Sequence, residues 1–151
     1  MSKEKIENLL KESCIGYDVP YEKLKKDIIV KDNSVYFSCG WYETFWKKYH
    51  GCIFSIVGYK GIGIHRWGQH IGSNYKDTLK SITFKKEDCS ITIVSDGNGE
   101  EIVSSGTFKP DVFKELYETV PDFIQEHNNK NLLNFTKKEN EDGNLVLNFK
   151  Q

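Results

Sequence analysis

Short apolar runs that alternate with polar residues recur between residues 27 and 107, and turn residues separate them. Residues 79 to 85, for example, place Ile82 and Phe84 on one face, because side chains point to opposite faces of a strand with a period of two. The segment 96 to 99, Asp-Gly-Asn-Gly, is typical of a tight hairpin turn, since Asn and Gly tolerate positive φ. The pattern predicts an antiparallel sheet built from consecutive hairpins.

The same pattern predicts six further strands. Residues 52 to 57 are apolar on both faces, which favours a central strand. Residues 41 to 49 fit either a helical turn or an extended segment, because aromatic side chains suit both. The further strands are expected at residues 28 to 30, 34 to 39, 52 to 57, 62 to 67, 89 to 95 and 101 to 107.

Helical patterns flank this β region. Residues 1 to 26 carry apolar positions at helical spacing and predict a short helical lead-in. Pro110 is expected to begin an amphipathic helix with a large apolar face, and Pro121 to kink or restart it. The asparagine-rich residues 127 to 151 predict an appended hairpin or a mobile tail. Residues 1 to 151 therefore fit one domain with a single core.

The composition is that of an ordinary globular protein, with 38% hydrophobic and 28% charged residues. The chain has 21 basic and 22 acidic groups, and a formal charge of -1 argues against a dedicated nucleic-acid binder. It contains no apolar run long enough to span a bilayer and no signal-peptide pattern, so we expect no transmembrane segment and a cytoplasmic location.

Two further features concern the source of the chain and its thiols. The abundance of Lys, Asn and Ile is typical of AT-rich genomes and indicates a low-GC bacterium or its phage. The widely spaced cysteines do not form the dense framework of a small secreted protein, so reduced thiols are expected. These cysteines are Cys14, Cys39, Cys52 and Cys89.

The order of elements resembles the pleckstrin-homology-like superfold, including bacterial PH-like and GRAM-like domains, over residues 27 to 126. The similarity is greatest in the strands at 79 to 85 and 90 to 94, the turn at 96 to 99 and the helix start at 110 to 116. The resemblance implies an α+β fold: a strongly bent antiparallel sheet or partly open barrel of about seven strands, capped by a C-terminal helix. It also implies a binding scaffold rather than an enzyme.

Phosphoinositide-binding members of that superfold usually carry basic residues between their first two strands. The matching segment here, residues 31 to 34, is Lys-Asp-Asn-Ser, so that pattern is absent. The lysine pairs at 47 to 48 and 85 to 86 fit solvated charges better than a lipid patch, and weak anionic-lipid binding is left as an alternative.

Residues 41 to 70 hold all three tryptophans, three of the four histidines and the only arginine. Aromatic residues and arginine dominate the energetics of protein interfaces, although a sheet of this size also needs large side chains in its core. The block predicts a protein-binding face, and the chain is interpreted as a non-catalytic interaction module without a cofactor, with a regulatory or toxin-neutralising role. The residues of that face are Trp41, Tyr42, Trp46, Tyr49, Arg66 and Trp67.

Two alternatives use the histidines of the same block. His50, Cys52, His65 and His70 offer nitrogen and sulfur ligands for zinc, but the paired short spacing of structural zinc sites is missing. A small hydrolase or nuclease would use histidines 50, 65 and 70 as acid and base, with Arg66 stabilising negative charge. Adjacent strand positions place His65 and Arg66 on opposite faces, which weakens this second alternative.

Three glycines precede this pair of residues, at positions 58, 61 and 63. Their spacing fits neither a phosphate-binding loop nor a dinucleotide-binding fingerprint. Tight hairpin geometry is therefore the expected reason for all three.

Overall fold

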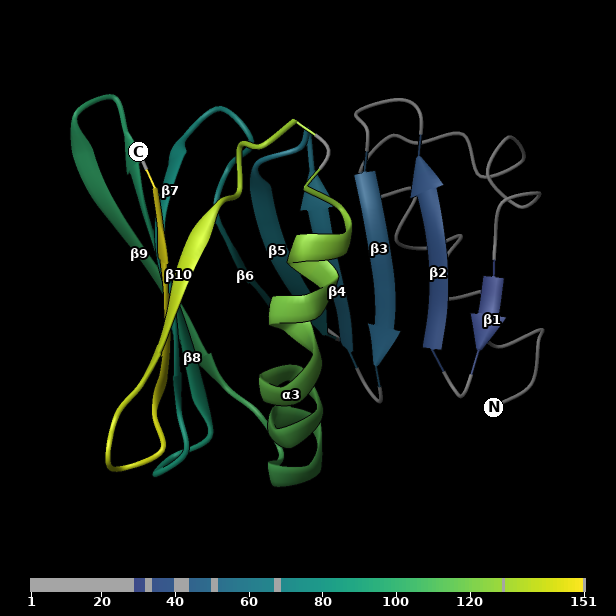
Figure 1. The fold of residues 1–151 in the computed structure, drawn as a ribbon, viewed down its shortest axis with the longest axis vertical. Helices are drawn as coiled ribbons and strands as arrows, with labels where there is room; N and C mark the ends of the chain where they lie inside the picture. Colours follow the sequence, from purple (N-terminus) through teal and green to yellow (C-terminus); the bar gives the residue numbers. More distant parts are fainter. Residues whose placement is uncertain are drawn as a thin grey trace.

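The computed structural model describes residues 29–31, 34–39, 44–49, 52–66, 69–128 and 130–150. They form an α+β fold in which two antiparallel sheets and one helix, α3, enclose a shared core (Figure 1). The expected helices within residues 1 to 26 lie outside the described residues. No helix in the described part of the chain has the length and apolarity needed to cross a membrane.

The first sheet is a simple meander in which each strand pairs with the next. Two residues of the β4–β5 turn, Gly58 (φ 61°) and Tyr59 (φ 65°), adopt the left-handed conformation that tight hairpins require. β4 is flanked by β3 and β5, and five of its six residues are buried, which confirms the expected central strand. The strands are β1 (Ile29–Lys31), β2 (Ser34–Cys39), β3 (Thr44–Tyr49), β4 (Cys52–Val57), β5 (Gly61–Arg66) and β6 (Gln69–Gly72).

The second sheet has the strand order β10-β11-β7-β8-β9. The turn between β8 and β9 is made by Asn98 (φ 53°) and Gly99 (φ 80°), so the predicted hairpin is confirmed. β7 to β9 follow one another along the chain, whereas β11 reaches β7 only after the helix. The strands are β7 (Thr78–Lys85), β8 (Ser90–Gly97), β9 (Glu100–Thr107), β10 (Phe135–Glu139) and β11 (Leu145–Phe149).

The helix α3 spans Pro110–Glu126 and begins at the predicted proline. Pro121 lies inside it without ending it. The apolar face predicted from the sequence is buried, and the helix lies across the space between the two sheets (Figure 1). Its buried residues are Val112, Phe113, Leu116, Val120, Pro121, Phe123 and Ile124.

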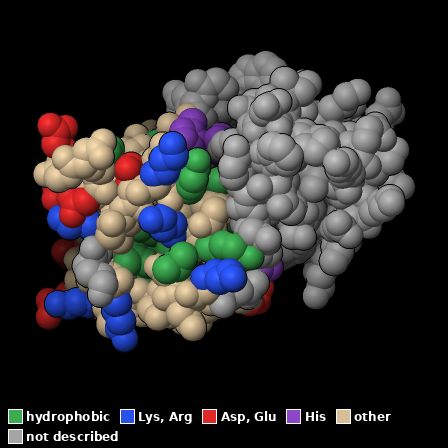
Figure 2. Space-filling model, turned by 90° about the horizontal axis from the view of Figure 1, so that it is seen from above, with side chains coloured by type: hydrophobic (Ala, Val, Ile, Leu, Met, Phe, Trp, Pro, Cys, Tyr) green, Lys and Arg blue, Asp and Glu red, His purple; other side chains and the backbone are tan. Residues whose placement is uncertain are grey.

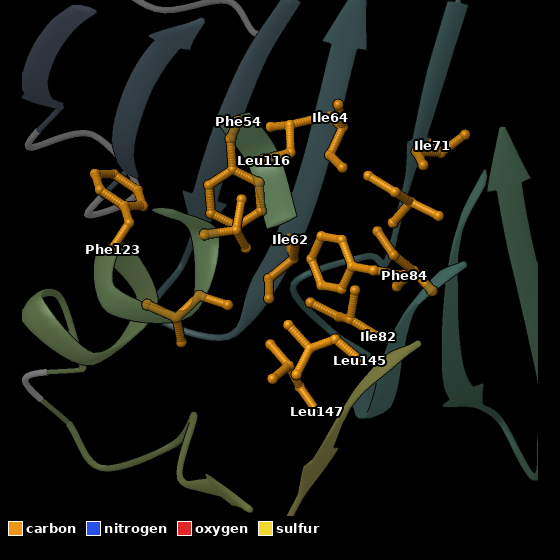
Figure 3. Close-up of a cluster of buried hydrophobic side chains, with 14 of the residues drawn as sticks. Phe54, Ile62, Ile64, Ile71, Ile82, Phe84, Leu116, Phe123, Leu145 and Leu147 are labelled. Carbon is orange, nitrogen blue, oxygen red and sulfur yellow. The ribbon is translucent and has the colours of Figure 1, made fainter. Parts of the chain in front are cut away.

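The core joins both sheets and the helix in one cluster of apolar side chains. Figure 3 shows Phe54 of β4, Phe84 of β7 and Leu116 of α3 pointing into the same interior, and each of them has a relative exposure of 0%. Leu145 and Leu147 of β11 enter the core from the side of the second sheet (Figure 3). A single continuous core is what the chain length predicted.

The described architecture differs from the expected seven-stranded fold with a helix at its end in two respects. The described strands form two sheets and no closed barrel, and they exceed seven because residues 44–49 and 69–72 are also strands and the C-terminal segment adds two more. The helix is not the last element, since the hairpin β10–β11 follows it and β11 pairs with β7. Residues 135–149 therefore form part of the second sheet, because Leu145 and Leu147 are needed to close its core.

A hydrogen-bonding side chain also ties the hairpin to the helix. Tyr117 of α3 donates to the Gly143 carbonyl at 2.8 Å, and its hydroxyl also contacts the Glu139 carboxylate. The ammonium of Lys86 lies 4.7 Å from the centroid of the Tyr117 ring. Of the lysine pair at 85 to 86, Lys86 therefore already has an aromatic partner, which weakens the proposed lipid patch.

Candidate functional site: a histidine-walled trough on the first sheet

Three strands of the first sheet carry only small side chains at one shared register position. Ser55 of β4 pairs with Gly63 of β5, and Gly63 pairs with Gly72 of β6. Glycine has no side chain, so this row is lower than its neighbours on the face of the sheet away from the core. We call this row and its two walls, described next, the histidine trough.

The first wall consists of His65 and His70, which are directly opposite each other on β5 and β6. Their rings stack with centroids 4.2 Å apart and planes inclined at 29°. A Cβ atom at Gly63 would lie 3.1 Å from the Nε2 atom of each ring and 3.1 Å from the Ser55 hydroxyl. A side chain at residue 63 would therefore crowd three polar atoms, so the close approach of the two rings and Ser55 requires glycine at this position.

The second wall is Tyr75, in the loop that follows β6. A Cβ atom at Gly61 would lie 2.8 Å from the Tyr75 main chain, and one at Gly58 would lie 3.0 Å from the Tyr75 Cβ atom. The loop is held in place because Ser73 donates its N–H to the Ile62 carbonyl at 2.7 Å and accepts the Ile62 N–H with its hydroxyl at 3.2 Å. Tyr75 is thus fixed across the β4–β5 turn.

A cavity of about 380 Å³ opens beside the histidine trough. This volume lies in the range of small-molecule sites. The His70 side chain is exposed and lines this cavity, whereas the His65 side chain is half-buried, so a ligand reaches the imidazole of His70 from solvent. The described lining consists of Val57, Ile62, Gly63, His70, Gly72, Ser73, Asn74 and Tyr75.

Both histidines of the wall are held in their neutral form. Burial, and secondly the neighbouring His70, lowers the pKa of His65 to about 4, and its Nε2 atom is withdrawn from solvent. Burial also lowers the pKa of His70, although part of that ring is exposed. Near neutral pH the trough therefore presents uncharged imidazoles, each with one nitrogen that carries a lone pair.

The structure separates Cys52 from the two histidines. Cys52 points into the core with a relative exposure of 4%, whereas His65 lies at the next register position of the β4–β5 pair, on the opposite face. The two expected ligand types are on different sides of the sheet, so Cys52 does not join His65 and His70 on one metal ion. Among the described residues no group of three or more His, Cys, Asp or Glu side chains is placed to hold a metal.

The other predicted site residues are only partly described. Trp46 is the register partner of Ser55, and Tyr49 that of Cys52, but neither side chain is described. The backbone of Arg66 pairs with Cys52 and Gln69, and its side chain is likewise not described. The remaining predicted residues lie outside the described residues: Trp41, Tyr42, His50 and Trp67.

Four residues of the trough and of the loop beside it were not predicted from the sequence: Ser55, Gly72, Ser73 and Tyr75. The signal that could have indicated them is an isolated glycine within a strand, which often marks a close approach of another group. Hairpin geometry explains Gly58, which has a φ of 61°. Gly61 and Gly63 have a different role, because they leave room for Tyr75 and for the imidazoles.

Replacing Gly72 by alanine is expected to lower the free energy of unfolding by about 2–3 kcal/mol. The added Cβ would lie 2.3 Å from the Ile62 carbonyl oxygen and 2.9 Å from the Gly63 Cα, both main-chain atoms that cannot rotate away. Gly63→Ala is the matched control, because its Cβ meets only side-chain atoms and should cost about 1 kcal/mol. Urea unfolding measures both, and equal losses would contradict this account of Gly72.

Among described groups, Figure 2 shows lysine side chains scattered between other residues, with no continuous basic patch on that face. This dispersion gives the lipid alternative no support on that face.

No family model, curated protein or solved structure matches the chain. The resemblance to pleckstrin-homology-like domains therefore stays a prediction, and the histidine trough is the feature on which a function can be argued.

Proposed function

We propose that the chain is a non-catalytic binding module that holds its ligand in the histidine trough. The observation that carries this proposal is the cavity of about 380 Å³, which is lined by His70 and Tyr75 beside the small residues Gly63 and Gly72. A strand face that carries glycines, with His70 and Tyr75 beside it, leaves room for a ligand that a regular sheet face would exclude.

The charge state of the trough selects the chemical class of the ligand. Two neutral imidazoles carry no positive charge, and each offers one lone pair and one N–H group, so they favour an uncharged hydrogen-bonding ligand over an anion. The described lining of the cavity contains no carboxylate, lysine or cysteine that would attract a particular charge. The hydrogen-bonding group that the trough binds can belong to a free small molecule or to a side chain of a partner protein.

The same pKa shifts weigh against the hydrolase alternative. Acid–base catalysis near neutral pH works best when one group holds a proton and another lacks one. Because the pKa values of His65 and His70 are both lowered, neither imidazole carries the extra proton that a general acid needs. A role in the cytoplasm of a low-GC bacterium or its phage, with a regulatory or toxin-neutralising partner, stays a prediction.

The test is ligand-observed NMR with three uncharged, planar hydrogen-bond donors: phenol, indole and benzamide. We expect saturation transfer to at least one of them with the wild-type chain and its loss in Gly63→Val, whose side chain would occupy the space between the imidazoles. Ser105→Val, at an exposed strand position of the second sheet, is the matched control and should bind as wild type.

The second part of the test shows whether the ligand of the trough is a free small molecule or a side chain of a partner protein. Peptides carrying Trp, Tyr or Asn are titrated into the same samples, and binding confined to peptides indicates a partner protein. Equal signals in the wild type and in a folded Gly63→Val variant would overturn the assignment of the site. Silence of all fragments and peptides would do so too.

A further inference from the structure

The loop after β6 brings two polar side chains, Ser73 and Asn74, to the cavity beside the trough. The Ser73 hydroxyl oxygen accepts the Ile62 N–H at 3.2 Å. The Asn74 Oδ1 atom accepts the Lys76 N–H at 2.9 Å. A hydroxyl still has its O–H group, and a carboxamide its NH2 group, when the oxygen accepts. Within the described part of the chain neither donor has an acceptor, so each is left for a ligand.

Main-chain carbonyl groups of the lining are already engaged within the fold. The Ile62 carbonyl accepts the Ser73 N–H at 2.7 Å, and the Asn74 carbonyl accepts the Asp77 N–H at 3.0 Å. These bonds fix the loop against β5, and they occupy acceptors that a ligand would otherwise use. The hydrogen-bonding groups that the loop offers to a ligand are therefore mainly donors, and the imidazole of His70 lies across the same cavity.

The rest of the described lining is apolar or has no side chain. Val57 and Ile62 are aliphatic, Tyr75 is aromatic, and Gly63 and Gly72 expose the strand surface. Such a lining suits a flat apolar ring, because burial of apolar area stabilises the complex while a few polar groups fix its orientation. Since the described lining holds no charged side chain, an ionised ligand would lose its hydration without gaining a partner.

From these groups we infer that the cavity binds an uncharged primary or cyclic amide carried on a flat apolar ring. The inference rests on the proposed binding function and names the class of its ligand. The carbonyl oxygen of the ligand accepts from the Ser73 hydroxyl and the Asn74 carboxamide, and its N–H donates to the His70 ring. An imidazole accepts a hydrogen bond only when it is neutral, and burial lowers the pKa of His70, which maintains that form.

Titration of benzamide and of phenol into the isotope-labelled full chain, followed by NMR, tests the inference. Benzamide should bind at least tenfold more tightly than phenol, which has no carbonyl oxygen. Asn74→Asp should weaken benzamide binding at least tenfold, because it removes the NH2 donor but retains the Oδ1 atom that accepts the Lys76 N–H and holds the loop. Asn148→Asp makes the same change at an exposed position of β11, and this matched control should bind benzamide as the wild type does.

The side-chain NH2 resonances of Asn74 give a readout that a purely structural role would not move. Benzamide should shift them in the wild type and leave those of Asn148 in place. Benzamide binding that is unchanged in Asn74→Asp, or that is no tighter than the binding of phenol, would overturn the assignment of an amide ligand. If phenol or indole then still binds in a Gly63-dependent manner, the binding-module proposal survives and only the amide inference falls. Silence of every probe overturns both.

Discussion

The free energy of unfolding should fall by about 2–3 kcal/mol as the pH is lowered from 7 to 4, through His65 alone. Burial, then the neighbouring His70, lowers the pKa of His65 in the folded state to about 4, below the usual value of 6.5. Between these values the unfolded chain takes up a proton that the folded chain rejects. The stabilisation that comes from keeping His65 neutral is therefore complete above pH 6.5, and it is lost as the pH falls toward 4. The lowered pKa of His70 acts in the same direction.

Urea unfolding at half-unit pH steps measures this dependence. The variant His65→Gln removes the titrating group, so its stability should fall less steeply between pH 6.5 and pH 4 than that of the wild type. The difference between the two slopes isolates His65 from the carboxylates, which titrate in both proteins. Parallel curves for the two proteins would show that burial of His65 does not control its protonation.

Truncation of Phe84 to alanine should lower the free energy of unfolding by about 3–5 kcal/mol. Phe84 has a relative exposure of 0%, and its ring packs against Phe113 and Tyr117 of α3 at centroid distances of 6.4 and 5.9 Å. Its removal leaves a cavity where β7, β11 and the helix meet (Figure 3). Because such a loss is a large part of the total stability of a small domain, Phe84→Leu provides a milder variant.

Val103→Ala is the control for this substitution. Val103 has a relative exposure of 59% on β9, so its truncation should change stability by less than about 0.5 kcal/mol. Thermal melting followed by circular dichroism, together with urea unfolding, measures all three variants. A loss below about 1 kcal/mol for Phe84→Ala would mean that the two sheets do not share the core described here.

Features that depend on neighbouring residues could be predicted from the sequence. The hairpin at Asn98 and Gly99 follows from local backbone preferences, and the alternation around Ile82 follows from the strand period. Helix α3 was predicted from its proline start and its apolar spacing.

Contacts between distant segments could not be predicted, because they depend on how complete elements pack. Nothing local in residues 135–149 specifies that β11 pairs with β7; that choice is made by the apolar side chains that β11 adds to the core. The same packing places Cys52 in the interior and the two imidazoles on the other face of the sheet.

The amino-acid sequence by itself thus determined most of the strands, the main turns and the helix α3, since periodicity and turn chemistry act over a few residues. Only the tertiary structure decided which side chains meet in the histidine trough. Gly63, Gly72 and Tyr75 come from three separate segments, and they become neighbours only when the sheet has formed and the loop after β6 has closed over it. Close packing across strands, which has no signature in a short stretch of sequence, is the physical reason for this division.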